Sequence, residues 1–450
     1  KTTRDYFLTD RSVPWWAICF TIVATETSTL TFIGIPAQAY VGNMTFLQLA
    51  IGYIIGRVLV SILFIPAYFR GELFTSYELL QRRFGTRVKT LAAVIFLITR
   101  SLADGIRLFT TALVISIVTQ VPVTGVVLVL GAAMIVYTMR GGVSAVIWTD
   151  VVQMFVYIAG AVAVAWSLLG RIPGGWPEVV RVGQETGRFV FFDPAFDLSR
   201  AYTIWAGVFG GVALTLSTHG TDQFLVQRLL SARSAKEASR GLILSGFIVF
   251  AQFVLFLLIG VMLFAYYQHV PVPLTLSRAD QILPIFVVSE LHNGLAGFIV
   301  AAIVAAALSP SLNAMAATTV SDFYLPYFNP TADQPTQMRV SKLATVGWGI
   351  VQLAVAIGAQ WMQRSVLDAG LAVLSFASGS VLGAFLLGTL APSVSERDTF
   401  WGMVAGLVVM TAVWWGTPVA FTWYVLIGAV TTCGVAGALS MMRTRSIVSR

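Results

Sequence analysis

Asp150 is the residue whose type and place first point to chemistry, because this carboxylate opens an apolar stretch long enough to cross a membrane. The run at 141–153 reads Gly-Gly-Val-Ser-Ala-Val-Ile-Trp-Thr-Asp-Val-Val-Gln, and apolar residues continue to Gly170. A carboxylate inside a bilayer is costly, and it persists mostly where a cation, a proton or a partner charge neutralises it. No basic residue lies near Asp150 in the sequence. We therefore predict that it binds a coupling ion.

Glu26 is the second such carboxylate, and it stands among five hydroxyl residues between 24 and 31, ahead of Gly34 and Pro36. We expect this helix to unwind near Glu26. A later segment has the same character, because three glycines precede Ser217-Thr218-His219-Gly220-Thr221-Asp222-Gln223. Broken helices that line a cavity can coordinate ions and solute. The alternative is that the small and hydroxyl residues only let helices pack closely.

Three further charges lie on one predicted helix at 90–120. Arg100, Asp104 and Arg107 are four and three residues apart, so they can share a face and neutralise one another. We interpret them as a structural cluster rather than as a solute site. Arg57 has no such partner on its own segment, and Glu26 is its candidate partner. The alternative is that Glu26 acts separately, as an ion ligand.

The elements that must position these charges are membrane-spanning helices. Hydrophobic residues make up 57% of the 450 residues and charged residues only 11%, which leaves too little polar surface for a water-soluble globule. A helix needs about 20 apolar residues to cross the hydrocarbon core. The pattern predicts twelve spans: 15–40, 46–69, 90–120, 125–139, 145–170, 202–230, 237–267, 294–320, 340–361, 365–391, 399–415 and 421–441.

Two of these segments, 90–120 and 202–230, are long enough that we expect a tilt or a break. The polar stretch 268–292 contains an apolar run at 282–291, for which we predict a surface helix.

The net charge of +8 is explained by topology. With the first terminus inside, most of the 28 Lys and Arg fall in cytoplasmic loops, as the positive-inside rule requires. We therefore expect an integral protein of the plasma membrane, or of the bacterial inner membrane, with both ends of this chain cytoplasmic. The basic residues are not interleaved with aromatic residues as in a nucleic-acid-binding surface, so the expected partners are the lipid bilayer and a small molecule. The oligomeric state stays open.

Four motifs together resemble the sodium/solute symporter family, which includes the sugar, proline, iodide, multivitamin and monocarboxylate cotransporters. They are the run 141–153, Asp222–Arg228, Ser311–Ala317 followed by Asp322, and Phe32–Tyr40. The residues 34–40 and 313–317 are most similar to the iodide, multivitamin and monocarboxylate branch.

The resemblance implies an all-α polytopic membrane protein built as one transmembrane domain over 1–450. It implies a five-plus-five inverted repeat of the leucine-transporter type, at about 14–170 and 202–391, with two extra C-terminal helices at about 399–441. It also implies a leading helix, which we expect to be missing from this sequence. The implied activity is sodium-driven uptake of a small polar organic solute or anion by alternating access, with no enzymatic step.

The resemblance also implies ion-binding residues. One sodium site would take backbone carbonyls from Ala24, Thr27 and Ile303, but the two hydroxyl positions that complete it in the family are Ala306 and Ala307 here. A second site would use Asp150 and Ser309. Three alternatives stay open: sodium on carbonyls helped by Glu26, sodium at Asp150, or a proton on either carboxylate. Sodium is the expected coupling ion.

The substrate cavity is expected between the two breaks. The candidate residues are Thr31, Gln48, His219, Asp222, Phe376 and Ser378. Leu371 aligns with the glutamine that binds sugar in the family, which disfavours a sugar as the substrate. Two rival functions remain: a proton-coupled or uncoupled carrier on the same fold, and a transport-like sensor module of a larger signalling protein.

Overall fold

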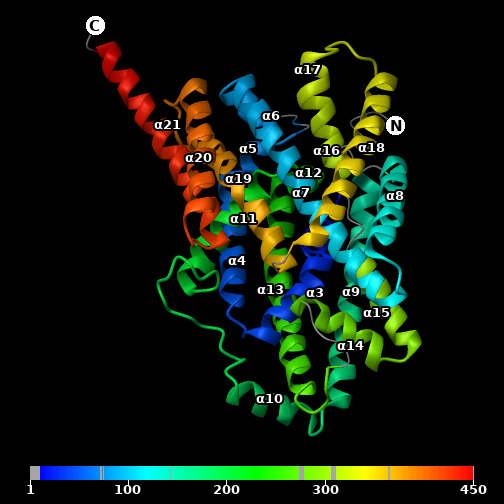
Figure 1. Cartoon of the computed structure of the whole chain (residues 1–450). Coiled ribbons are helices and arrows are strands. Elements are labelled where there is room, and N and C mark those ends of the chain that lie inside the picture. Colours follow the sequence, from blue (N-terminus) through cyan, green and yellow to red (C-terminus); the bar gives the residue numbers. More distant parts are fainter. Residues whose placement is uncertain are drawn as a thin grey trace.

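The computed structural model describes residues 11–70, 73, 75–141, 143–272, 278–305, 311–362 and 365–448. In Figure 1 most long helices run side by side along one common direction, and a long loop connects α10 to the segment that leads into α11. Within these ranges, seven helices are long and apolar enough to span a bilayer, or eight when one bent pair is counted as a span. Three shorter apolar helices, α4, α8 and α15, lie among them. The structure thus supports an integral membrane protein.

The helices that matter for the site have the following bounds: α2 (Trp15–Glu26), α3 (Thr29–Val41), α4 (Leu47–Leu63), α7 (Thr86–Thr119), α9 (Val143–Arg171), α11 (Gly211–Gly220), α12 (Gln223–Leu230), α13 (Ala235–Tyr266), α15 (Asn293–Ala305), α16 (Leu312–Thr318) and α19 (Val366–Leu390). The remaining α-helices are α5 (Ile65–Tyr68), α6 (Tyr77–Arg83), α8 (Val123–Gly141), α10 (Gly175–Glu185), α14 (Ile282–Glu290), α17 (Leu325–Tyr327), α18 (Gln334–Gly358), α20 (Glu396–Gly416) and α21 (Tyr424–Val448).

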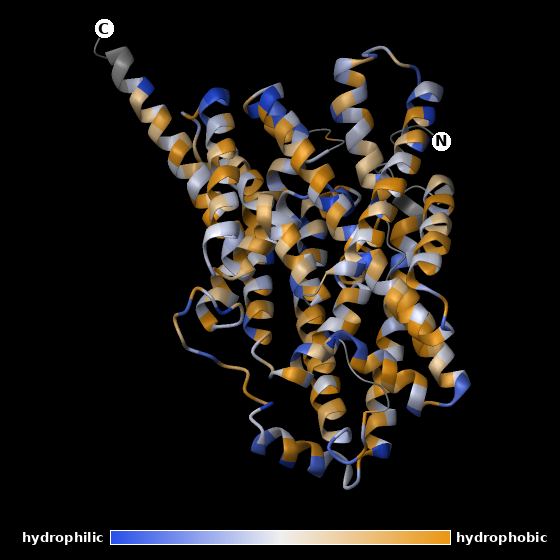
Figure 2. Cartoon of the chain, in the orientation of Figure 1, coloured by the Kyte–Doolittle hydropathy of each residue, from blue (hydrophilic) through white to orange (hydrophobic). Residues whose placement is uncertain are grey.

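Hydrophobic side chains cover the middle of the bundle on its outside as well as its inside. In Figure 2 hydrophobic residues run along the long helices, while hydrophilic residues gather at the helix ends and on α10. Large exposed apolar residues such as Ile62, Val129 and Trp166 lie on outward faces. In lipid such faces are stable, and helices satisfy their own backbone hydrogen bonds.

The first predicted break is confirmed between α2 and α3, whose axes differ by 62°. Thr27 and Ser28 leave the helical conformation there, and Ser28 starts α3 with a capping box that it shares with Thr31. Pro36 lies inside α3 and does not end it. The break therefore falls beside Glu26, where the hydroxyl-rich sequence offers side chains that cap the new helix.

The second predicted break is also confirmed. A π-helical turn at Ala206–Gly210 leads into α11, which stops at Gly220, and α12 restarts at Gln223. The glycines let this segment approach α4 closely: a Cβ on Gly52 would lie 2.6 Å from the Gly207 carbonyl oxygen. Glycine at both positions therefore allows the backbones of α4 and the second broken segment to approach this closely.

One expectation about an individual helix needs correction, and another is narrowed. For the segment 90–120 the expected alternatives are a tilt and a break, and α7 continues from Thr86 to Thr119 without a break. The predicted surface helix at 282–291 is instead buried: α14 packs Leu283, Phe286 and Val287 inside the molecule. Its first six residues are apolar, so the helix has no polar face to turn toward water.

Candidate functional site

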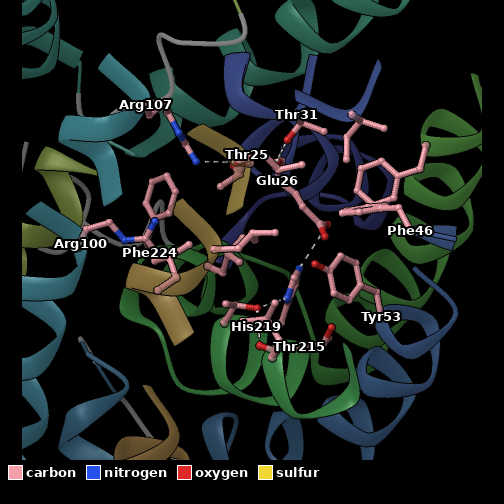
Figure 3. A pocket seen from close by; sticks show the side chains of 18 residues that line it. Thr25, Glu26, Thr31, Phe46, Tyr53, Arg100, Arg107, Thr215, His219 and Phe224 are labelled. Carbon is pink, nitrogen blue, oxygen red and sulfur yellow. Dashed lines mark hydrogen bonds and ion pairs between the residues drawn. The ribbon is translucent and has the colours of Figure 1, made fainter. Parts of the chain in front are cut away.

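A cavity of about 110 Å³ lies where the two helix breaks meet (Figure 3). Residues of α2, α3, α4, α7, α11, α12, α13 and α19 line it. Its polar lining consists of Thr25, Glu26, Thr31, Arg100, Arg107, Thr215, Thr218 and His219. Phe46, Tyr53, Phe224 and Phe253 supply much of the apolar wall. An apolar chamber with a few converging polar groups is the usual form of a small-molecule site.

Glu26 and Arg57 form the predicted ion pair. The Arg57 guanidinium is fully buried and also donates from Nε to the Ser245 hydroxyl, 3.2 Å away. His219 Nε2 lies 3.4 Å from Arg57 Nη2 and 3.7 Å from Glu26 Oε2. The pair therefore joins the end of α2 to α4 and α11, on one wall of the cavity.

Asp150 has a partner that its sequence neighbourhood did not reveal. Arg228 of α12 donates from Nη2 to Asp150 Oδ2 across 3.0 Å, and Thr21 donates to the same oxygen across 2.7 Å. Both charged side chains are almost completely buried. Asp150 thus has a counter-charge that the sequence did not reveal, because α9 and α12 meet only in the tertiary structure. Binding of a coupling ion by Asp150 stays a prediction.

The charge cluster on α7 is present, but it reaches further than expected. Asp104 lies 3.8 Å from Arg100 and 4.0 Å from Arg107, as the predicted helix face requires. Arg100 makes its nearer ion pair with Asp222, and the Ser311 hydroxyl donates to Asp104. The cluster therefore ties α7 to the second break and to α16.

Arg107 is the cation in this cluster that is least satisfied. Its Nη2 lies 3.5 Å from the Thr25 carbonyl oxygen, and its Nε lies 4.0 Å from Asp104 Oδ1. Its Nε and Nη1 are buried and make no hydrogen bond within the described ranges. Figure 3 shows the side chain reaching toward the first break from the opposite wall. Such donors can bind an anion in the cavity.

Two of the three residues expected to hold sodium through their carbonyls lie at the first break, and the third is hydrogen-bonded to the start of α3. Ala24 and Thr27 are buried at the first break, and the Thr29 hydroxyl of the following helix donates to the Ile303 carbonyl oxygen across 3.0 Å. The Thr27 hydroxyl accepts a hydrogen bond of 2.6 Å from Gln252. Ala306, Ala307 and Ser309 lie outside the described residues.

The six candidate substrate residues fall into three groups. Thr31 and His219 line the cavity. Asp222 and Ser378 line a smaller pocket at the second break, where Asp222 also caps α12 through the Phe224 N–H at 2.8 Å. The other two residues lie elsewhere.

Gln48 and Phe376 do not line the cavity. Gln48 donates to the Tyr202 carbonyl oxygen and accepts from the Asp193 N–H, so it fastens α4 to the loop before the second break. Phe376 packs edge-on against Trp414 in an apolar cavity beside α7, α19 and α20. Helical spacing placed both residues on the correct segments but did not show which face turns inward.

Several lining residues carry no clear signal in the sequence. The sequence predicts a structural role for Arg107, because its spacing to Asp104 does not show that its side chain reaches the cavity. Thr215 lies four residues before His219, on the same face of the helix, so this spacing could have identified it as a lining residue. Thr218 directly precedes His219 and also lines the cavity. Tyr53 and Phe253 carried no signal beyond their aromatic character.

Comparisons with known proteins match nearly the whole chain. A profile described as "Sodium:solute symporter family" matches residues 6–406. The chain is 28% identical to the sodium/sialic acid symporter SiaT of Proteus mirabilis over 98% of the chain and 90% of that protein. It is 30% identical to the human sodium/iodide cotransporter and 32% identical to the rabbit sodium-dependent multivitamin transporter, over 91% and 92% of the chain. The chain spans 64% and 66% of those two relatives.

Solved structures show the same fold. A substrate-bound, outward-open Na+-coupled sialic acid symporter superposes with a TM-score of 0.90 at 28% identity, over 98% of this chain and 93% of that one. Mhp1, a nucleobase-cation-symport-1 transporter in a closed conformation, superposes at 0.59 over 97% and 95%, and its 13% identity supports the fold alone. The iodide and multivitamin cotransporters belong to the branch that the sequence motifs resemble. The motifs did not predict the similarity to sialic acid symporters. This chain belongs to the sodium:solute symporter family, whose relatives couple sodium to solute transport.

Proposed function

We propose that this sodium-coupled symporter takes up a small anionic solute through the cavity between the two helix breaks, by alternating access. The observation that carries the proposal is the charge balance around that cavity. Among the described residues at the two breaks, the carboxylates are Glu26, Asp104, Asp150 and Asp222, and the guanidiniums are Arg57, Arg100, Arg107 and Arg228.

These charges cancel when neither ion nor solute is present. A sodium ion entering the region adds one positive charge to a water-poor environment, where an uncompensated charge is costly. An anion in the cavity restores neutrality, so ion and solute favour each other's binding. A neutral solute would leave the added charge uncompensated. Electrostatics alone therefore supports joint binding of sodium and an anion.

Arg107 is the proposed anchor for the anion. Its buried, unsatisfied Nε and Nη1 are donors, and the hydroxyls of Thr25, Thr31 and Thr215 line the same cavity. A carboxylate or oxyanion matches a guanidinium in charge and geometry. His219 lies on the opposite wall with the Glu26–Arg57 pair and would contact the other end of the solute.

The volume of the cavity limits the size of the solute. An apolar protein cavity of about 150 Å³ holds benzene, which has six non-hydrogen atoms, so 110 Å³ accommodates on the order of four. The sialic acid named for the bacterial relatives is also a carboxylate, but it exceeds this volume. We therefore propose a short carboxylate or a small oxyanion as the substrate.

Two positions are proposed for sodium. One consists of the carbonyls of Ala24 and Thr27 at the first break and of Ile303 on α15, and the hydrogen bond from Thr29 to the Ile303 carbonyl supports it. The other consists of Asp150, with Ser309 as the second ligand that the family resemblance implies. Sodium prefers oxygen ligands as other hard cations do.

The proposed architecture follows the family. The inverted repeats cover about 14–170 and 202–391, the extra helices cover about 399–441, and both ends of the chain are cytoplasmic. The positive-inside distribution supports this orientation. The residues around the two breaks would then move between states in which the cavity opens to one side or to the other.

The test is uptake by the purified protein in proteoliposomes with a sodium gradient and a proton gradient imposed separately. The solute panel pairs short carboxylates with their uncharged amides, and adds iodide, sialic acid and a sugar. We expect sodium-dependent accumulation of a short anion and none of its amide. Accumulation of amide and acid alike would overturn the anionic assignment.

A further inference from the structure

The two oxygens of the Asp150 carboxylate have different surroundings. Oδ2 accepts hydrogen bonds from Thr21 at 2.7 Å, from Arg228 at 3.0 Å and from Thr25 at 3.4 Å. Oδ1 is buried and accepts no hydrogen bond within the described part of the chain. A buried carboxylate oxygen without a partner is expensive. This oxygen is therefore a ready ligand for a cation.

Arg228 occupies the other side of the carboxylate. It also donates from Nε to the Thr21 hydroxyl, 3.2 Å away, and from Nη1 to the Phe224 carbonyl oxygen, 2.7 Å away. Its guanidinium thus belongs to α12 and reaches across to α9 and α2. Arg228 neutralises Asp150 without any bound ion.

Phe224 links this pair to the solute cavity. The guanidinium carbon of Arg228 lies 4.4 Å from the ring centroid of Phe224, and that of Arg100 lies 4.6 Å from it. A cation over an aromatic ring is attracted to its face, so both arginines hold the ring in place. Phe224 lines the cavity, where Figure 3 shows it beside Arg100.

We propose that Arg228 and a sodium ion alternate on Asp150, and that Phe224 transmits the exchange to the solute cavity. This inference rests on the sodium role of Asp150 in the proposed function. A sodium ion on Oδ1, with oxygens of Thr21 or Thr25, would place a second cation beside a carboxylate that is already paired. Repulsion between the cations then weakens the hold of Arg228 on Asp150.

In this proposal, ion binding at Asp150 is linked directly to the shape of the solute cavity. When Arg228 moves from Asp150, one of the two cations that hold the Phe224 ring moves with it. The cavity wall then changes shape as the ion binds, and Thr25 contributes to both sites because it lines the cavity and donates to Asp150. Solute affinity depends on sodium through this wall, and linkage makes the effect reciprocal.

The first experiment measures binding of radioactive sodium to the full chain in nanodiscs, with no solute present. Arg228→Gln removes the competing cation, so the half-saturating sodium concentration should fall about tenfold, a usual size for coupling between two ligands. Arg228→Lys keeps the charge but loses the forked bonds to Thr21 and Phe224, and about threefold tighter binding is expected. Arg181→Gln, on the exposed face of α10, is the matched control and should leave binding unchanged.

The second experiment measures how sodium changes solute affinity. Phe224→Leu keeps an apolar wall but removes the ring that both arginines contact. The sodium-dependent change in solute affinity should be lost, because Arg228 then has no contact with a ring in the cavity wall. A native sodium-dependent change in this variant would overturn the role of Phe224.

Several outcomes separate the ideas. Unchanged or weaker sodium binding in Arg228→Lys overturns the exchange, even where Arg228→Gln fails to fold. An Asp150→Asn protein that binds the native number of sodium ions at the native half-saturating concentration also overturns it, but anion uptake in the native protein would then still support the proposed function. Failure of the native protein to accumulate any anion overturns the proposed function, whatever the sodium binding shows.

Discussion

Glu26, the last residue of α2, forms an ion pair with Arg57 of α4, and this contact fastens the first helix break to the helix that packs against the second. Arg57 is fully buried, while Glu26 keeps 15% of its side chain exposed. Gly52 and Gly207 bring α4 and the second broken segment together one turn away from Arg57. The pair therefore holds two segments of the cavity wall together, and its two charges neutralise each other before any ion binds.

The Glu26–Arg57 pair predicts that the stability losses of the two single variants do not add up in the double variant. Glu26→Gln or Arg57→Met each strands a charge, which typically costs about 3–5 kcal/mol when a buried pair is broken. The double change avoids that penalty, so its thermal midpoint in detergent should lie above that of either single variant. The surface pair Glu178–Arg181 is the matched control, where the effects of the two single changes on the thermal midpoint should be small. Additive losses at Glu26 and Arg57 would show that the residues act separately.

Asp150→Asn should abolish concentrative uptake, because the proposed ion site loses its charge. The structure adds a second effect, since the variant leaves Arg228 buried without its anion. We therefore expect lower stability as well, and we expect Asp150→Asn with Arg228→Gln to regain stability but not uptake. The checks are thermal unfolding and sodium-driven accumulation in proteoliposomes. Full accumulation by Asp150→Asn would remove this residue from the ion pathway.

Asp222→Asn should act on stability rather than on solute preference. Asp222 accepts from the Phe224 N–H, pairs with Arg100 and lies outside the main cavity. Asn keeps the cap, because its side-chain oxygen can still accept from the Phe224 N–H. The loss of stability comes from Arg100, which is left buried without the Asp222 charge. Uptake should fall by the same factor for every solute in the panel, at unchanged KM. A change in the ranking of solutes would instead place Asp222 in contact with substrate.

Arg107→Gln should weaken binding of the anion. Removing a charged hydrogen bond typically costs about 1.5–3 kcal/mol, so KM should rise about tenfold or more while sodium binding without solute is retained. The exposed Arg200, which pairs with Asp193, gives the matched control Arg200→Gln with an unchanged KM. An Arg107→Gln protein with the native KM for every anion would rule out the anchor.

The sequence by itself determined the helical membrane character, the two breaks and the family. Local signals suffice for these features. The apolar runs are long enough to cross a bilayer, and Ser28 and Asp222 are residue types that cap the start of a helix, as they do for α3 and α12. The hydroxyl-rich run around Glu26 and the glycines before Ser217 mark both breaks without knowledge of any partner. The Glu26–Arg57 pair was also within reach, because each charge lacked a partner on its own segment.

Only the tertiary structure decided which charges meet and which faces turn inward. Arg228 lies 78 residues from Asp150, and Arg100 lies 122 residues from Asp222, so no spacing rule connects them. Gln48 and Phe376 lie on the expected segments but face a loop and Trp414 instead of the cavity. In a bundle that is apolar on both its inner and outer surfaces, hydrophobic periodicity does not show which face of a helix points inward. Close packing between distant helices sets that rotation, and it thereby determines the partner of each buried charge.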